Sequence, residues 1–228
     1  MSTYAELHCI SNFSFLRGAS RPEELVEQAA CLGYKAIAIT DECSFAGVVK
    51  AHVKAEELAQ KNQPIELILG SEFHLSNGAI CIALVSNKAA YQELSALITL
   101  CRRRCEKGHY QFELNDALLH LQNSLIIYKP APFAQPQQEL ILRLSGLPRL
   151  WIAFERRYDG HDESRYQTAF QFATLIDKPM VACGNVHMHC RQRKPLLDTL
   201  TAIRENTTVD QLGKKIQSNS ERFLRPLE

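Results

Sequence analysis

The chain has 228 residues, 46% of them hydrophobic, with 26 Lys and Arg against 25 Asp and Glu. A net charge of +1 argues against capture of nucleic acid by the charge of the whole chain, and no apolar run approaches the roughly 20 residues that span a bilayer. Eight scattered cysteines and a start without an apolar signal segment predict reduced thiols and a cytosolic protein.

The first third of the chain predicts alternating strands and helices. Strands are expected over 4–9, 36–40 and 65–75, and helices over 20–32 and 46–61. Ser20 and Glu23 predict a capping box at the start of the first helix, and Gly33 ends it. In the second helix, Val49, Val53 and Leu58 are expected to face the core.

The remaining two thirds continue the alternation. Asn77-Gly78 predicts a hairpin turn into a strand over 79–85, and Asn87 predicts the cap of a long helix. Further strands are expected over 125–128, 150–154 and 180–183, and helices over 137–144 and 162–176. Strand and helix alternate about seven times without a long linker. The pattern predicts a single α/β domain over 1–228, a closed or nearly closed β/α barrel.

Potential metal ligands follow several apolar runs. His8 ends the first predicted strand, Glu72 the third, and His187 and His189 follow the last. Imidazole and carboxylate together suit zinc, manganese or iron. Histidines are also common as satisfied polar residues, so a metal site and a structural role both stay open. The isolated histidines at 52, 120 and 161 are interpreted as ordinary polar residues.

Two other patterns carry weaker signals. Cys101, Cys105 and His109 have the spacing of half a zinc site, but both cysteines fall on the apolar stripe of a helix and are interpreted as core residues. A basic group at 102–104 and 107 is interpreted as a solvated helix face. Arg191, Arg193 and Lys194 form a basic rim after the last strand, for which a phosphate contact and simple solvation both remain open.

Three stretches resemble a known family. They are AELHCISNFSFLRGASRPEELVEQA, AIAITDECSFAGVVKAH and GNVHMHCRQRKPLLDTLTAIRENT. They resemble the N-terminal PHP (polymerase and histidinol phosphatase) domain of bacterial DNA polymerase III alpha-type enzymes, most closely the error-prone, damage-inducible branch. The resemblance covers essentially the whole chain and implies a distorted seven-stranded β/α barrel.

The resemblance also implies a degenerate metal site. The family ligands that this chain keeps are His8, Glu72 and His187. Other residues replace family ligands or acidic pocket groups: Ile10, Arg17, Glu42 and Asn185. Three ligands are too few for a phosphoesterase cluster, and the Arg17 cation opposes metal binding. Asp41 is expected to hydrogen-bond the loop backbone or Arg17, and an ion pair of Arg17 with an acidic neighbour would stand in for the metal.

Two functions follow as expectations. In the first, the chain is a catalytically silent structural or interaction module, an N-terminal fragment of a DNA-directed, error-prone polymerase acting in DNA repair, translesion synthesis and mutagenesis. This cytoplasmic parent would use magnesium and bind DNA, with its own remaining domains, a sliding clamp and accessory mutagenesis proteins as partners. The fragment itself would hold no cofactor, or one adventitious zinc, and would not contact a membrane. The alternative is a free-standing metal-dependent phosphoesterase of the histidinol-phosphatase kind.

Overall fold

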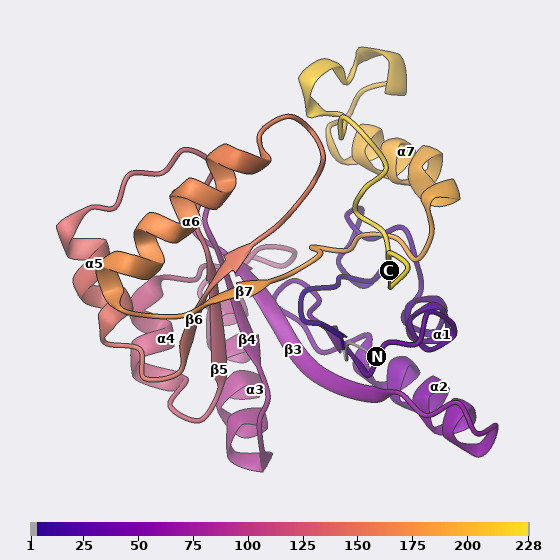
Figure 1. Cartoon of the computed structure of the whole chain (residues 1–228), viewed down its shortest axis with the longest axis horizontal. Helices are drawn as coiled ribbons and strands as arrows, with labels where there is room; N and C mark the ends of the chain where they lie inside the picture. The colour runs from indigo at the N-terminus through magenta and orange to yellow at the C-terminus, as the bar shows by residue number, and fades with distance from the viewer. Residues whose placement is uncertain (1–3, 228) are drawn as a thin grey trace. The chain divides into compact units, whose positions relative to one another are not determined.

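The computed structural model describes residues 4–227 and contains seven strands and seven α-helices within that range (Figure 1). The strands are ordered as they occur in the sequence, from β1 to β7. The α/β class and the seven strands are therefore as predicted. In the described range, no helix has both the length and the apolar character needed to cross a membrane.

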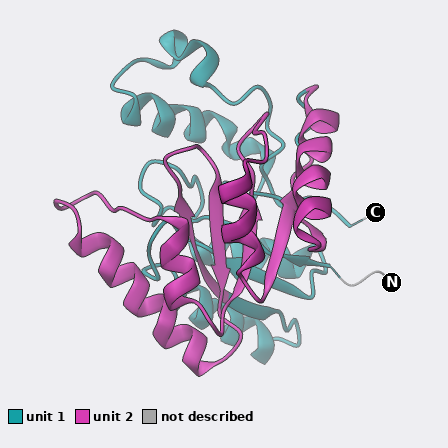
Figure 2. Ribbon diagram, turned by 90° about the vertical axis from the view of Figure 1, so that its left-hand side faces the viewer, with its two compact units in different colours: residues 1–68, 157–159, 184–228 teal, residues 69–156, 160–183 magenta. Residues whose placement is uncertain are grey.

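The chain divides into two compact units, coloured separately in Figure 2. Unit 1 comprises residues 1–68, 157–159 and 184–228, and unit 2 comprises residues 69–156 and 160–183. Each unit is therefore assembled from segments far apart in the sequence. β3 (Glu66–His74) begins in unit 1 and continues into unit 2.

Unit 1 is built on two short parallel strands and two packed helices. β1 (Ala5–Glu6) pairs with β2 (Ala36–Ile39), and α1 (Pro22–Cys31) packs against α2 (Val48–Gln60). Its core combines one apolar face from each helix with β2, and includes Leu25, Val26, Ala29, Ile37, Ile39, Ala51, Ala55 and Leu58. α7 (Lys194–Arg204) follows, flanked by the short 3-10 helices η1 (Arg191–Arg193), η2 (Val209–Gln211) and η3 (Gly213–Lys215).

Two predictions about these helices are wrong. Val49 and Val53 are 70% and 52% exposed, because α2 buries its small Ala51 and Ala55 face against α1. Ser20 does not cap α1. The N-cap is the next residue, Arg21, whose amide donates to Glu24 Oε2 at 2.8 Å.

Unit 2 is a mixed sheet covered by helices. The pairs β3–β4 (Ile80–Leu84) and β4–β5 (Leu125–Lys129) are antiparallel, whereas β5–β6 (Leu150–Phe154) and β6–β7 (Met180–Ala182) are parallel. The predicted hairpin is confirmed: Gly78 has a φ of +81°, and the amide of Ala79 donates to Asn77 Oδ1. The helices are α3 (Lys88–Arg103), α4 (Leu114–His120), α5 (Gln138–Ser145) and α6 (Asp162–Ile176).

Local signals in α3 behave largely as predicted. Asn87 caps the helix by accepting from the amide of Ala90 at 2.9 Å. Cys101 is fully buried, in agreement with a core role rather than a zinc half-site. Cys105 lies beyond the end of the helix at Arg103 and is half-buried, so its placement on the helical stripe was wrong. All eight cysteines are free thiols.

One ion pair in unit 2 makes stability depend on pH. Arg104 donates two hydrogen bonds to Asp116, at 2.7 and 2.8 Å. Burial alone would raise the pKa of Asp116, but the Arg104 guanidinium and the Glu113 amide hold that pKa below its ordinary value of 3.8. The stabilisation is therefore present above pH 3.8 and is lost as the pH falls through the lowered pKa.

We expect Asp116→Asn to lower the melting temperature at pH 7, with a difference from wild type that shrinks below pH 3.8. Thermal unfolding followed by circular dichroism from pH 7 down to about pH 2.5 measures this. Glu139→Gln, which removes the carboxylate of an exposed helical pair, is the control and should show a small effect at all pH values. A constant difference between Asp116→Asn and wild type over the whole range would contradict the assignment.

Candidate functional site

Backbone hydrogen bonds hold three polar segments of unit 1 side by side. Cys9 forms a parallel β-bridge with Val186, and the amide of Ile10 donates to the carbonyl of Val186 at 2.9 Å. The amide of Thr40 donates to the carbonyl of Cys9 at 2.8 Å. The ends of β1 and β2 and the segment after Gly184 therefore meet in one place, as strand ends of a β/α protein are expected to do.

Asp41, directly after β2, organises the loop between β1 and α1. Its carboxylate is buried and accepts three hydrogen bonds of 2.7 Å: from the amide and the hydroxyl of Ser11, and from the hydroxyl of Ser14. A Cβ at Gly47 would lie 2.6 Å from Asp41 Oδ2, so glycine is needed at the start of α2. The prediction that Asp41 bonds the loop backbone is confirmed.

Arg17 and Glu42 form the ion pair that was predicted to stand in for a metal. Arg17 Nη1 lies 2.5 Å from Glu42 Oε2, and the two side chains are 15% and 23% exposed. Ser14 ties both residues to the loop: its carbonyl accepts from the Arg17 amide, and its hydroxyl accepts from the Glu42 amide. The partial burial strengthens this pair relative to an exposed one.

A second arginine contacts the imidazole of His187. Arg222 Nη1 lies 2.9 Å from His187 Nε2, and the His187 amide donates to the Arg222 carbonyl at 3.0 Å. Asn185 Oδ1 is also 2.9 Å from Nε2. The Asn185 amide oxygen only accepts and the guanidinium only donates, so Nε2 donates to Asn185 in one imidazole tautomer and accepts from Arg222 in the other. In the tautomer that accepts from Arg222, the guanidinium occupies the Nε2 lone pair that a bound metal would need.

His8 is fully buried next to a carboxylate that the sequence did not reveal as important. Its amide donates to Glu6 Oε1 at 2.9 Å, and Glu6 also accepts from the Gly184 amide and the Tyr4 hydroxyl. Burial raises the pKa of Glu6, while these hydrogen bonds favour its ionised form. A side chain at Gly184 would collide with Glu6 Oε2. Glu6 therefore holds the His8 strand end against the segment after Gly184.

His189 has a partner of its own. Its Nδ1 lies 2.8 Å from Ser20 Oγ, and its amide donates to the same oxygen at 2.9 Å. Burial lowers the pKa of His189 and favours the neutral imidazole. The Ser20 hydroxyl, which was predicted to cap α1, thus connects Ser20 with His189, which lies 169 positions later in the sequence.

Glu72 lies on β3 within unit 2. It is fully buried, and its Oε1 is 2.9 Å from His74 Nε2. The amide of His74 donates to the Tyr110 hydroxyl at 2.9 Å. Residues i and i+2 of a strand share a face, which explains why this carboxylate and imidazole meet. Within unit 2, Glu72 and His74 together offer one oxygen and one nitrogen as potential metal ligands.

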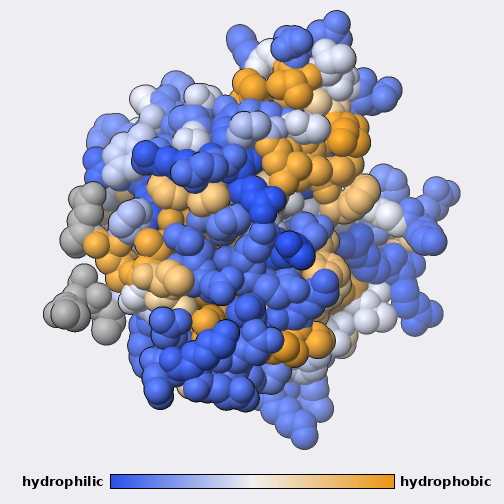
Figure 3. Space-filling model, turned by 90° about the vertical axis from the view of Figure 1, so that its right-hand side faces the viewer, coloured by the Kyte–Doolittle hydropathy of each residue, from blue (hydrophilic) through white to orange (hydrophobic). Residues whose placement is uncertain are grey.

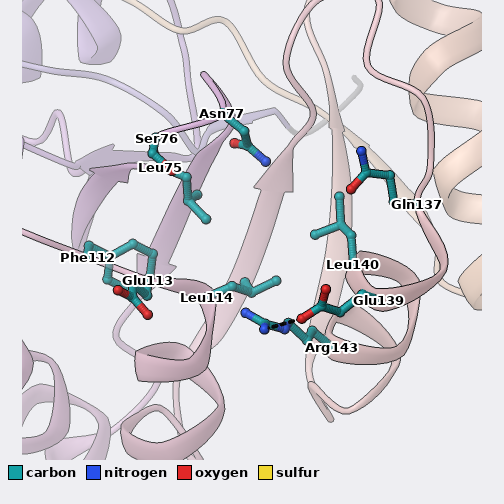
Figure 4. A pocket seen from close by; sticks show the side chains of 10 residues that line it. All are labelled: Leu75, Ser76, Asn77, Phe112, Glu113, Leu114, Gln137, Glu139, Leu140 and Arg143. Carbon is teal, nitrogen blue, oxygen red and sulfur yellow. Dashed lines mark hydrogen bonds and ion pairs between the residues drawn. The ribbon is translucent and has the colours of Figure 1, made fainter.

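A pocket of about 320 Å³ lies elsewhere in unit 2 (Figure 4). Apolar side chains and a polar rim line it: Leu75, Ser76, Asn77, Phe112, Glu113, Leu114, Gln137, Glu139, Leu140 and Arg143. Its acidic and basic groups include Glu139 and Arg143, which pair with each other across one helical turn. None of the predicted site residues is among the residues that line this pocket.

The chain matches a known protein family. The family model described as "PHP domain" matches residues 6–172. The chain belongs to the PHP domain family. A solved structure titled as a putative metal-dependent phosphoesterase from Bifidobacterium adolescentis is 15% identical with a TM-score of 0.59, over 82% of this chain and 88% of that one. An amidohydrolase from Chromobacterium violaceum is 16% identical with a TM-score of 0.59, over 81% and 87%. At these identities the likeness shows the fold alone.

Relatives at higher identity are much longer proteins. An error-prone DNA polymerase of Teredinibacter turnerae is 48% identical over 99% of this chain. Its counterpart in Pseudomonas aeruginosa is 43% identical over 100% of this chain. The chain spans only 21% and 22% of the length of these two relatives.

The unit 1 residues matched to PHP metal ligands do not suit a metal cluster. Ile10 is fully buried and offers no donor atom. Arg17 places a guanidinium against Glu42, and Arg222 Nη1 contacts His187 Nε2. Two guanidinium groups thus contact the Glu42 carboxylate and the His187 imidazole. A guanidinium does not offer the ligand atoms that bind zinc or manganese.

Proposed function

We propose that residues 1–228 form the PHP domain of an error-prone DNA polymerase and serve there as a non-catalytic structural or interaction module. Identity of 43–48% over nearly the whole chain to proteins of that name supports the parent activity. The family match over residues 6–172 takes in segments of both units, which supports a single PHP domain.

The observation that carries the silent role is the contact of Arg222 with His187 Nε2. Together with the Arg17–Glu42 pair, it supplies positive charge from the protein itself at family ligand positions. Catalytic phosphoesterase sites need metal ions to generate hydroxide and to neutralise developing charge, and guanidinium groups cannot generate hydroxide from bound water.

This chain and its proposed parent polymerase are expected to differ in their cofactors and partners. The retained ligands are His8 and His187 in unit 1 and Glu72 in unit 2, and the chain is proposed to hold at most one weakly bound zinc ion. Magnesium, DNA, a sliding clamp and accessory mutagenesis proteins belong to the proposed cytoplasmic parent polymerase, whose remaining domains are the proposed direct partners of this chain. A shared fold with a solved structure supports the alternative, a free-standing phosphoesterase.

We expect the purified chain to hydrolyse neither p-nitrophenyl phosphate nor single-stranded DNA with added manganese or zinc. Release of p-nitrophenol and of labelled nucleotides measures this, with a PHP-fold phosphoesterase as positive control. Activity that persists through purification and disappears in a His8→Ala, His187→Ala double variant would overturn the silent role and favour the phosphoesterase.

A further inference from the structure

A second pocket lies in unit 1, where two of its lining residues, Glu221 and Phe223, flank Arg222. Its volume is about 460 Å³, and it is lined by Tyr158, Arg191, Glu221, Phe223, Arg225 and Pro226. These residues, which we call the Tyr158 pocket, come from three segments of unit 1: the turn at 157–159, the start of η1, and residues 221–226. The volume lies in the range of about 300–1,000 Å³ typical of small-molecule sites.

Two guanidinium groups in the pocket stack on aromatic rings. Arg191 Cζ lies 4.7 Å from the centre of the Phe223 ring, and Arg225 Cζ lies 5.0 Å from the centre of the Tyr158 ring. A guanidinium over a ring is attracted by the electrons of the ring face and presents a planar cationic group. Arg191 remains 58% exposed and Tyr158 56% exposed, so both stacks are accessible from solvent.

The pocket is fixed by contacts outside the stacks. Glu221 pairs with Arg191 at 2.9 Å and with Arg225 at 3.6 Å. The Tyr34 hydroxyl donates to the carbonyl of Arg225 at 2.7 Å, and Asn219 Nδ2 donates to the carbonyl of Tyr158 at 3.1 Å. Because these contacts hold the pocket residues in place before binding, less conformational entropy is lost when a ligand binds.

The charge and shape of the pocket select a ligand class. Two guanidinium groups against one carboxylate leave a net positive charge, which favours an anion. The two planar stacks favour a flat aromatic ring, and the Glu221 carboxylate can accept from an amino group on that ring. A phosphate joined to an amino-bearing ring is a nucleotide, whereas an acidic peptide offers the charge without the ring.

We propose that the Tyr158 pocket binds a nucleotide, either free or as a unit of a single strand. The base stacks on the arginine–aromatic pairs, and its phosphate contacts a guanidinium edge. The proposal gives the Arg191 end of the basic rim a phosphate-binding role. It goes beyond the proposed function and stands whether or not the parent protein is a polymerase.

Fluorescence anisotropy of the 228-residue chain with a labelled twelve-nucleotide single strand of mixed sequence tests this. Arg191→Ala and Tyr158→Leu each remove one stacking surface for a base and should each weaken binding about tenfold. Arg191→Lys keeps the charge but loses the planar stack, and should weaken binding nearly as much. Thermal unfolding of each variant establishes that it is folded.

A Lys214→Ala, Lys215→Ala variant is the matched control, because it removes two positive charges of the same C-terminal region outside the pocket. It should change the affinity less than twofold. Competition by free AMP at equal nucleotide concentration identifies a free nucleotide as the ligand, and competition by the strand alone identifies a single-strand site. Equal competition by inorganic phosphate, equal losses in the lysine control, or no binding by the wild-type chain would each overturn the proposal.

Discussion

Replacing Asp41 by Ala is expected to lower the free energy of unfolding by about 3–5 kcal/mol. The carboxylate accepts three short hydrogen bonds from Ser11 and Ser14, all buried. Truncation leaves the Ser11 amide and both hydroxyls without their charged acceptor and opens a space beside Gly47. Chemical denaturation followed by circular dichroism measures the change.

Two variants separate the hydrogen bonds from the charge. Asp41→Asn keeps the shape and one carbonyl oxygen, so its cost should be clearly below that of Asp41→Ala. Ser44→Ala, which removes an exposed hydrogen bond from the Ala46 amide, is the control for a local hydroxyl loss and should change stability by less than about 0.5 kcal/mol. If Asp41→Ala unfolds at the same denaturant concentration as wild type, Asp41 does not organise the loop.

Replacing Arg17 by Ala is expected to cost about 1–3 kcal/mol, between the values for exposed and buried ion pairs. The variant leaves the Glu42 carboxylate 23% exposed without the guanidinium 2.5 Å away. For a chain of this size, each kcal/mol lowers the melting temperature by about 2–4 °C. Lys35→Ala breaks a pair with Glu66 that is 63% and 68% exposed, and it serves as the matched control with an expected cost below about 1 kcal/mol.

A double-mutant cycle isolates the Arg17 pair. Glu42→Gln and the Arg17→Ala, Glu42→Gln double variant complete the cycle, and the coupling free energy should be at least about 1 kcal/mol in favour of the pair. A coupling near zero, or an unchanged melting temperature for Arg17→Ala, would show that this pair does not replace a metal in holding the carboxylate.

Local patterns in the sequence predicted most of the secondary structure. β6 and α6 have the predicted boundaries, because an apolar strand and a helical period are properties of neighbouring residues. The hairpin at Asn77-Gly78 and the Asn87 cap have equally local causes. α4 and α7 were not predicted. α4 has only seven residues, which is too short for a clear helical period. α7 follows a basic segment that was interpreted by its charge and not by its helical period.

Residues whose role depends on distant contacts could not be predicted in the same way. Arg222 reaches a histidine 35 positions earlier, and no local signal marks it. In the sequence, Glu6 looks like an ordinary polar residue of a half-buried strand. Its hydrogen bond from the Gly184 amide is visible only in the folded chain. The faces of α2 were misassigned because two valines look more apolar than the alanines that permit close packing. Hydrophobic residues also form patches on the otherwise hydrophilic face in Figure 3, so exposure does not follow residue type alone.

Arg17 and Arg222 are proposed to take the place of bound metal in this PHP domain. Elemental analysis of the purified chain, dialysed against buffer with equimolar zinc and manganese and then against metal-free buffer, tests this claim most directly. We expect at most one ion per chain, and a loss of any bound zinc in His187→Ala. Two or more ions retained per chain would contradict the claim.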